Sequence, residues 1–133
     1  MDFELETPIA DDQIRRLKTG DVVALSGIIV TARDAAHQWL TDRFVHRQAV
    51  SSDEDRQILN QLKEHLNGGI LYHCGPVVSR LESGGYRFVA AGPTTSIREE
   101  PYQADVMRLF NLKGVIGKGG MGAKTLRACG EGP

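Results

Sequence analysis

Cysteine is scarce in this chain. Its 133 residues include two cysteines, Cys74 and Cys129, and these do not form a Cys-x-x-Cys pair. This usage indicates reduced thiols in a cytoplasmic protein and argues against a disulfide framework. Two thiols are also too few to ligate an iron–sulfur cluster. We therefore expect this chain to bind no metal by itself.

An excess of either charge is also missing. Sixteen basic and seventeen acidic residues leave a net charge of −1, which argues against a nucleic-acid partner. No run approaches the roughly 20 apolar residues that cross a membrane. The acidic start, residues 1–6, lacks the apolar segment of a secretory signal. We expect a cytoplasmic protein without a membrane or nucleic-acid partner.

Glycine, by contrast, is abundant. Many of the fifteen glycines stand at the ends of short apolar runs, where they indicate turns. The pattern predicts strands at residues 3–7, 22–30, 70–78, 86–91 and 115–116. It predicts helices at about 11–19, at 31–44 with Thr31 as N-cap, at about 51–66 with a solvated polar face that includes Asp55, and at 101–110 and 123–129. Intermingled strands and helices predict one α/β domain with a mixed sheet over residues 1–133.

The most informative stretch is residues 89–98. An apolar run ends at Gly92-Pro93, three hydroxyl residues and Arg98 follow, and Pro101 suits the first turn of a helix. A strand, a tight turn and a helix entrance present backbone N–H groups to anions. The fork of Arg98 matches a carboxylate in two-point geometry. We expect a small anionic substrate here.

Two other cations repeat this placement. Arg33 and Lys118, like Arg98, each follow an apolar strand and precede a helix. Ligands of α/β sheets collect at the carboxyl ends of strands, so the three cations could line one crevice for a dicarboxylate or a phosphate. Nearby cations would lower the pKa of a hydroxyl among Thr94, Thr95 and Ser96 and make it a base. The alternatives are that Arg33 is a surface residue and that the hydroxyls of residues 94–96 cap a helix.

Two further features have simpler interpretations. The glycine-rich loop at residues 117–122 lacks the spacing of a phosphate loop, because its lysine comes second, so a nucleotide-binding domain has little support. His37 lies one helical turn after Arg33 and is better explained as a hydrogen-bonded packing residue than as a base.

The motifs together resemble a known family, the β subunit of iron–sulfur-dependent hydro-lyases, which includes class I fumarate hydratase and L-tartrate dehydratase. The resemblance covers about Pro8 to Lys124. The matching segments are Leu25-Ser26-Gly27, Arg33-Asp34-Ala35-Ala36-His37, Gly75-Pro76, Gly92-Pro93-Thr94-Thr95-Ser96 with Arg98, and Ile116-Gly117-Lys118-Gly119.

This resemblance implies a swivelling β/β/α domain with a central mixed sheet and flanking helices. It implies a hetero-oligomer with an α subunit that holds a 4Fe–4S cluster, and a substrate between the two chains. By analogy, Arg33, Arg98 and Lys118 would hold the substrate carboxylates. Thr94 would move the C3 proton, while iron of the partner's cluster would accept the C2 hydroxyl. The implied reaction is hydration of fumarate to L-malate.

Two alternatives to this reaction stay open, and the chain departs from the family pattern in two places. The alternatives are L-tartrate dehydration and a module that binds an anion or a partner without turnover. Arg98 is followed by Glu99-Glu100, where the family usually has Met-Asp, so the helix start could be shifted. The family's β portion continues beyond the lysine loop, so we expect a domain shortened at its C-terminus, with apolar surface exposed.

Overall fold

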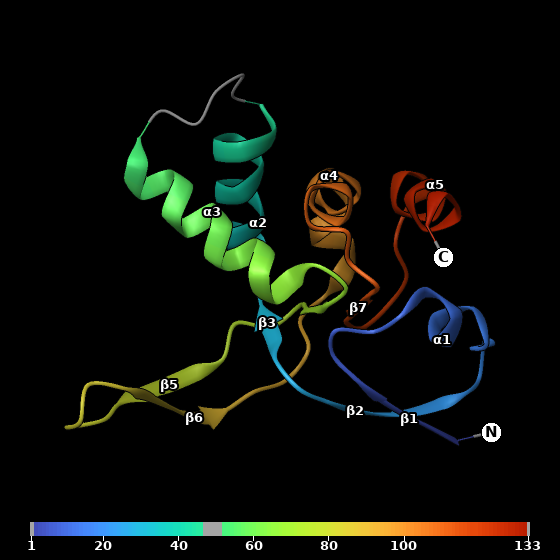
Figure 1. Ribbon diagram of the computed structural model, residues 1–133, viewed down its shortest axis with the longest axis horizontal. Coiled ribbons are helices and arrows are strands. Elements are labelled where there is room, and N and C mark those ends of the chain that lie inside the picture. The colour runs from blue at the N-terminus through green and yellow to red at the C-terminus, as the bar shows by residue number, and fades with distance from the viewer. Residues whose placement is uncertain (1, 47–51, 133) are drawn as a thin grey trace.

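The computed structural model describes residues 2–46 and 52–132. It confirms the α/β class, because short strands and helices alternate along the chain (Figure 1). The elements, in order, are β1 (Asp2–Glu6), α1 (Asp11–Arg15), β2 (Val22–Ser26), β3 (Ile29–Thr31), α2 (Asp34–Leu40), the π-helical turn η1 (Thr41–Val45), α3 (Asp53–Leu66), β4 (Ile70–Tyr72), β5 (Val77–Arg80), β6 (Tyr86–Ala90), the 3-10 turn η2 (Ser96–Glu99), α4 (Glu100–Phe110), β7 (Gly114–Ile116) and α5 (Ala123–Glu131).

The strands form three small sheets in place of the one mixed sheet that we expected. Strands β3, β4 and β7 make a parallel sheet with β4 in the centre. Strands β1 and β2 form a separate parallel pair, and β5 and β6 form an antiparallel hairpin. In the three-stranded sheet Thr31 pairs with Tyr72, and Tyr72 pairs with Ile116. The carboxyl ends of all three strands therefore lie at one edge.

The three-stranded sheet has a different layer on each face, because successive side chains of a strand point to opposite sides. Leu71 of β4 is fully buried in a core with helix residues, among them Leu66 and Phe110. Its neighbour Ile70 packs instead with Leu5 and Ile9 beside the β1–β2 pair. Figure 1 shows α2 and α4 on the opposite side of this sheet from β1 and β2. This β/β/α layering agrees with the arrangement that the resemblance implies.

The predicted strand at residues 22–30 is two strands in two sheets. Gly27 interrupts it with φ of 98°, a left-handed value that favours glycine. A Cβ there would also collide with the Thr7 hydroxyl. The prediction that the run is buried was wrong for β2, since the side chain of Val22 remains 64% exposed. The turn lets β2 pair with β1 while β3 enters the central sheet.

The predicted helix at residues 31–44 begins later than expected. Thr31 is the last residue of β3 and does not cap the helix, because it pairs with Tyr72. Arg33 occupies the N-cap position without a side-chain cap, and α2 starts at Asp34. The chain then continues through η1. The displacement matters because it leaves the Arg33 side chain outside the helix, at the strand end.

Helix α3 begins as predicted but buries one of its acidic residues. The Ser52 hydroxyl accepts a hydrogen bond from the Asp55 N–H at 3.1 Å, while the neighbouring residue 51 lies outside the described residues. Asp55 was wrongly assigned to a solvated face. Its carboxylate is buried and accepts from Arg43 Nη1 at 2.6 Å. This ion pair joins α3 to η1.

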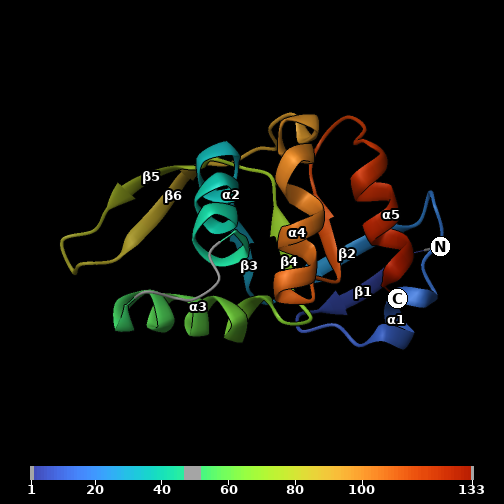
Figure 2. The same cartoon turned by 90° about the horizontal axis from the view of Figure 1, so that it is seen from above.

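The β5–β6 hairpin extends away from the rest of the molecule in both views (Figures 1 and 2). All residues of both strands are exposed, and several of them are large and apolar. Val77 is 60% exposed and Phe88 is 57% exposed. The hairpin therefore offers an apolar surface that the described residues leave uncovered.

Candidate functional site

The carboxyl edge of the three-stranded sheet joins the segments that carry the predicted site residues. The N–H of Ala32, just before Arg33, donates to the carbonyl of Tyr72 at 2.9 Å. The N–H of Thr94 donates to the carbonyl of His73, one residue beyond β4, at 2.8 Å. Ser96 N–H donates to the carbonyl of Lys118 at 3.0 Å. The segments that carry Arg33, Thr94 and Lys118 therefore meet at one sheet edge.

Arg33 and Arg98 have a common neighbour at this edge. The Arg33 side chain lies against Gly75, where a Cβ would be only 3.0 Å from its Nη1. Both arginine charges also act on the carboxyl group of Glu99 and oppose the rise of its pKa. The positive charges of Arg33 and Arg98 therefore act on one carboxyl group without forming an ion pair with it.

The three cations are exposed, and none is ion-paired with another residue that the structure describes. Arg33, Arg98 and Lys118 all present their side chains to solvent. Within residues 2–46 and 52–132, none of them forms an ion pair with a carboxylate. Some other cations of the chain are paired, such as Arg43 with Asp55 and Arg108 with Glu131. Unpaired positive charge at one sheet edge is suited to bind an anion.

Thr94 is half-buried beside these cations. Its hydroxyl makes no hydrogen bond with any other residue that the structure describes. The alternative that the hydroxyls cap a helix is not what the geometry shows, because Thr95 is the N-cap of η2 and makes no side-chain cap. The Thr94 hydroxyl is therefore available to a ligand.

A buried polar cluster behind the edge was not predicted. Its members are fully or almost fully removed from solvent: His37, His73, Ser96, Glu99 and Gln103. A signal was present in the sequence, because Glu99 and Gln103 continue the helical spacing of the buried residues Val106 and Phe110. Polar residues on the buried stripe of a helix need partners inside the protein.

Burial favours the neutral form of the two histidines of this cluster. Burial lowers the pKa of His73, whose Nδ1 is 2.9 Å from the Ser96 hydroxyl and whose Nε2 contacts the Gln103 amide oxygen. Burial likewise lowers the pKa of His37, whose Nδ1 donates to the carbonyl of Arg33 at 3.0 Å. The two rings meet edge to face with centroids 5.5 Å apart. The prediction that His37 is a hydrogen-bonded packing residue is confirmed.

Glu99 is the most perturbed acid at the edge. It is completely buried, and neither of its carboxyl oxygens has a hydrogen-bond partner among the described residues. Burial, together with the neighbouring Asp34, raises the pKa of Glu99 to about 7. A large fraction of Glu99 therefore keeps its proton near neutral pH.

The described residues do not fit an iron–sulfur cluster. Across residues 2–46 and 52–132, no three His, Cys, Asp or Glu side chains gather closely enough to hold a metal ion. The two cysteines are free thiols, Cys74 buried and Cys129 exposed.

The helices described in this structure include none with the length and apolar character needed to cross a bilayer.

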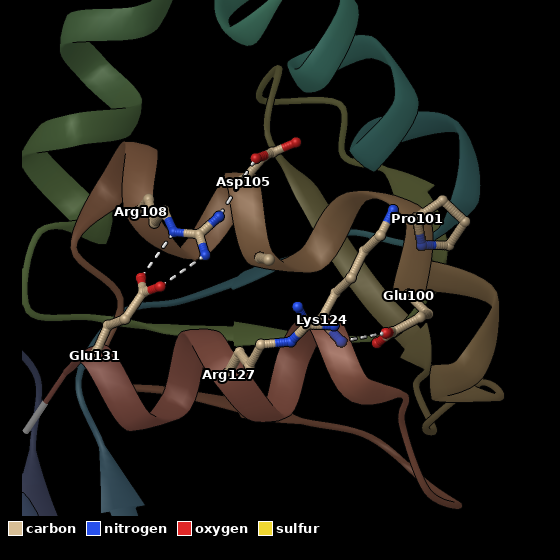
Figure 3. A pocket seen from close by; sticks show the side chains of 8 residues that line it. Glu100, Pro101, Asp105, Arg108, Lys124, Arg127 and Glu131 are labelled. Atoms are coloured by element: carbon tan, nitrogen blue, oxygen red, sulfur yellow. Dashed lines mark hydrogen bonds and ion pairs between the residues drawn. The ribbon is translucent and has the colours of Figure 1, made fainter.

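A separate cavity of about 380 Å³ lies between α4 and α5 (Figure 3). Several of its charged side chains are already paired. Arg108 makes two hydrogen bonds to Glu131, at 2.9 and 3.0 Å, and Glu100 accepts from the Thr125 hydroxyl at 2.6 Å. None of the predicted site residues lines this cavity. The sheet edge is therefore the stronger candidate site.

Fold and site together define an α/β protein with a cationic sheet edge suited to a small anion. Comparison with known proteins narrows this class. The family model described as "Fumarase C-terminus" matches residues 1–132, and the chain belongs to that family.

Two relatives illustrate the range of the family. The chain is 51% identical over 127 residues to a protein of Geobacillus stearothermophilus named "Putative fumarate hydratase class I"; the match covers 96% of this chain and 21% of the relative. It is 33% identical over 125 residues to the L(+)-tartrate dehydratase subunit beta of Escherichia coli strain K12, covering 94% of this chain and 54% of that one. The chain thus spans about half of the second relative and about a fifth of the first.

Proposed function

We propose that this chain is the substrate-binding β part of an iron–sulfur-dependent hydro-lyase that interconverts fumarate and L-malate. One observation carries the proposal: Arg33 and Lys118 lie at a single sheet edge, Arg98 follows shortly after Ser96 of that edge, and none of the three forms an ion pair with a described residue. Membership of the Fumarase C-terminus family supports the reaction class.

The proposed substrate suits this set of cations. Fumarate carries a carboxylate at each end of a rigid four-carbon chain, so it needs cationic groups at two places. A guanidinium can bind a carboxylate through two parallel hydrogen bonds, whereas an ammonium acts as a point charge. Arg33 and Arg98 would provide the two-point contacts and Lys118 would add a third positive charge.

Thr94 is the proposed catalytic residue. Hydration adds the hydroxyl of water to C2 and its remaining proton to C3, and the reverse reaction removes both. The Thr94 oxygen would transfer the C3 proton, because its hydroxyl is free and half-buried. Three neighbouring cations would stabilise the alkoxide form and so lower the pKa of the hydroxyl.

A second chain or domain completes this proposal. The described residues do not fit a 4Fe–4S cluster, so we assign the cluster to an α partner, with the substrate held between the two. The name of the Escherichia coli relative, a subunit beta, supports a hetero-oligomer. The exposed apolar side chains of the β5–β6 hairpin, just before the site, offer a surface for that partner to cover. We place the assembly in the cytoplasm.

L-tartrate is the second candidate substrate, and it differs from malate by one hydroxyl. The tartrate dehydratase relative supports it at 33% identity, and the relative named for fumarate hydratase supports fumarate at 51%. We therefore propose fumarate first. A module that binds a partner or an anion without turnover is the alternative that the experiment below excludes.

The test is anaerobic co-expression of this chain with the cluster-bearing protein encoded beside it. The purified pair is assayed for fumarate hydration and for tartrate dehydration, and each protein is assayed alone. Activity of the pair that neither protein has alone supports a divided active site, and the preferred substrate decides between the two reactions. A cluster-loaded complex without turnover on either substrate would overturn the proposal.

A further inference from the structure

We propose that Gln103 is a positioning residue that links Arg33 to Lys118 through a buried chain of hydrogen bonds across His37 and His73. The proposal rests on the function proposed above, in which Arg33 and Lys118 both bind the substrate carboxylates. It also makes a claim about hydrogen bonding that can be tested without any activity.

The contact between Gln103 and His73 fixes the direction of the hydrogen bonds toward Lys118. The Gln103 amide oxygen can only accept, so Nε2 of neutral His73 carries the proton and donates to it. His73 Nδ1 is then the unprotonated nitrogen. The Ser96 hydroxyl lies 2.9 Å from this nitrogen and donates its one hydrogen to it, while its oxygen accepts from the Lys118 N–H at 3.0 Å.

Gly117 lies beside the hydrogen bonds that connect His73, Ser96 and Lys118. A Cβ at Gly117 would overlap the Ser96 hydroxyl and lie 2.6 Å from His73 Nδ1. The hydroxyl and the imidazole therefore occupy the space that any side chain at this position would need. The close approach of the lysine loop to His73 requires glycine here.

The Arg33 end fixes the opposite tautomer in the other histidine. His37 Nδ1 lies 3.0 Å from the Arg33 carbonyl, which can only accept, so Nδ1 carries the proton. Neutral His37 then has a free acceptor at Nε2. Both His37 Nε2 and the Gln103 amide nitrogen are buried without a partner among the described residues. The first is an acceptor and the second a donor.

These two atoms are complementary, and we infer that they pair. The Gln103 side chain lies near enough to His37 to influence its pKa, and the two imidazole rings are 5.5 Å apart. A donor and an acceptor left unpaired in the interior would each destabilise the fold. One hydrogen bond between them would satisfy both and complete the chain from Lys118 to Arg33.

The amide of Gln103 suits the middle position. Gln103 must accept from His73 and donate to His37, and an amide does both. A carboxylate would supply acceptors alone and favour protonation of a histidine, while a thioether would leave both rings unpaired. Neutral histidines are also required, which agrees with the lowered pKa of His37 and of His73.

The first test reads the tautomers in the wild-type chain. Nitrogen-15 NMR of the histidine side chains should show His73 protonated on Nε2 and His37 protonated on Nδ1, both neutral at pH 7. The opposite tautomer in either ring would overturn the proposal. The result does not depend on turnover, so it separates a failure of this chain of bonds from a failure of the proposed function.

The second test compares Gln103→Met with Gln61→Met, a substitution on the exposed face of α3. In Gln103→Met we expect the Lys118 amide to exchange its hydrogen at least about tenfold faster. His73 loses its hydrogen bond to residue 103 and therefore holds the Ser96 hydroxyl, which accepts from this amide, less firmly. In the complex with its partner, KM for fumarate should rise by about tenfold while kcat changes less. Gln61→Met should change neither quantity. Wild-type amide exchange at Lys118 in a folded Gln103→Met chain would contradict the positioning role.

Discussion

The side chain of Arg33 lies directly over Gly75, so that a Cβ at residue 75 would overlap its Cδ and come within 3.1 Å of its Nε. Glycine at this position therefore gives the guanidinium its place at the sheet edge. We predict that Gly75→Ala pushes Arg33 away from the proposed carboxylate position. The expected result is a KM for fumarate raised about tenfold in the assembled enzyme, with a smaller change in kcat.

The matched control for this substitution is Gly130→Ala. A Cβ at Gly130, in α5, meets no atom within 4 Å, so the same chemical change occurs in open space. It should leave KM unchanged and make the helix slightly more stable, by about 0.5–1 kcal/mol. Equal kinetics for the two variants would show that Arg33 does not hold the substrate.

Arg98 tests the two-point contact. The Arg98→Lys substitution keeps the positive charge and removes the planar fork, so we expect KM to rise although the charge of the site is unchanged. Lys118→Ala should also raise KM, because it removes one of the three unpaired cations. The control is Arg56→Lys on α3, where the side chain is 67% exposed and 4.0 Å from Asp53. Wild-type KM values in both site variants would remove the proposed carboxylate clamp.

Thr94 tests the proton transfer. Thr94→Val keeps the shape of the side chain and removes its hydroxyl, so turnover should fall by about 100-fold or more while KM changes little. Thr95→Val is the comparison, since Thr95 lies next in the chain and its side chain makes no cap. Stopped assays of fumarate hydration in the assembled enzyme measure both. Turnover of Thr94→Val within a few-fold of wild type would show that the hydroxyl is not the proton carrier.

The parts of the site that could be predicted depend on local sequence. Arg33 and Lys118 each follow a short apolar run, and such runs form strands whatever lies elsewhere in the chain. The Gly92-Pro93 turn is also a local signal, although the bond from the Thr94 N–H to the carbonyl of His73 is not. The rule that neighbouring parallel strands end together places Arg33 and Lys118 at one edge. It does not place Arg98, which follows β6 of the antiparallel hairpin.

The parts that could not be predicted depend on distant partners. The break at Gly27 is decided by where the two halves of the run pair, with β1 on one side and β4 on the other. Likewise Asp55 looks solvated in its own helix, and only the turn at η1 brings Arg43 against it. The buried Gln103 was visible as a polar residue in an apolar stripe, but its partner His73 is 30 residues away.

Glu99 predicts a pH dependence of stability. Its pKa is raised from the usual 4.5 to about 7 in the folded chain, first by burial and then by Asp34. Between these values the folded state keeps a proton that the unfolded state releases, so stability falls as pH rises from about 5 to 7 and then levels off. Glu99→Gln removes this titration and should be more stable than wild type at pH 8 by roughly 2–4 kcal/mol.

Urea unfolding at pH 5 and pH 8 measures this difference. From pH 5 to pH 8, the free energy of unfolding of wild type should fall relative to that of Glu99→Gln. The control Glu82→Gln changes an exposed carboxyl group in the turn between β5 and β6 and should follow wild type at both. Parallel stability curves for wild type and Glu99→Gln would mean that Glu99 is ionised in the folded state over this whole range.

The ion pair between Arg43 and Asp55 should contribute measurably to the free energy of unfolding. The Asp55 side chain is 8% exposed and its oxygen is 2.6 Å from Arg43 Nη1. Asp55→Asn keeps the size and removes the charge, leaving Arg43 without a counter-ion, and we expect a loss of about 1–3 kcal/mol. We expect a smaller loss than for a fully buried ion pair, because the Arg43 side chain is 39% exposed and its charge is partly screened by solvent.

Asp53→Asn is the matched control, because both aspartates lie in the first turn of α3 and contribute equally to its dipole term. Asp53 is 97% exposed and 4.0 Å from Arg56, so its pair with that arginine should be worth almost nothing. The difference in urea midpoints between the two variants therefore isolates the pair that joins α3 to η1. Equal midpoints would show that the Arg43–Asp55 contact does not stabilise the fold. The position of η1 would then depend on apolar packing, which includes the rings of Trp39 and Phe44 with centroids 5.4 Å apart.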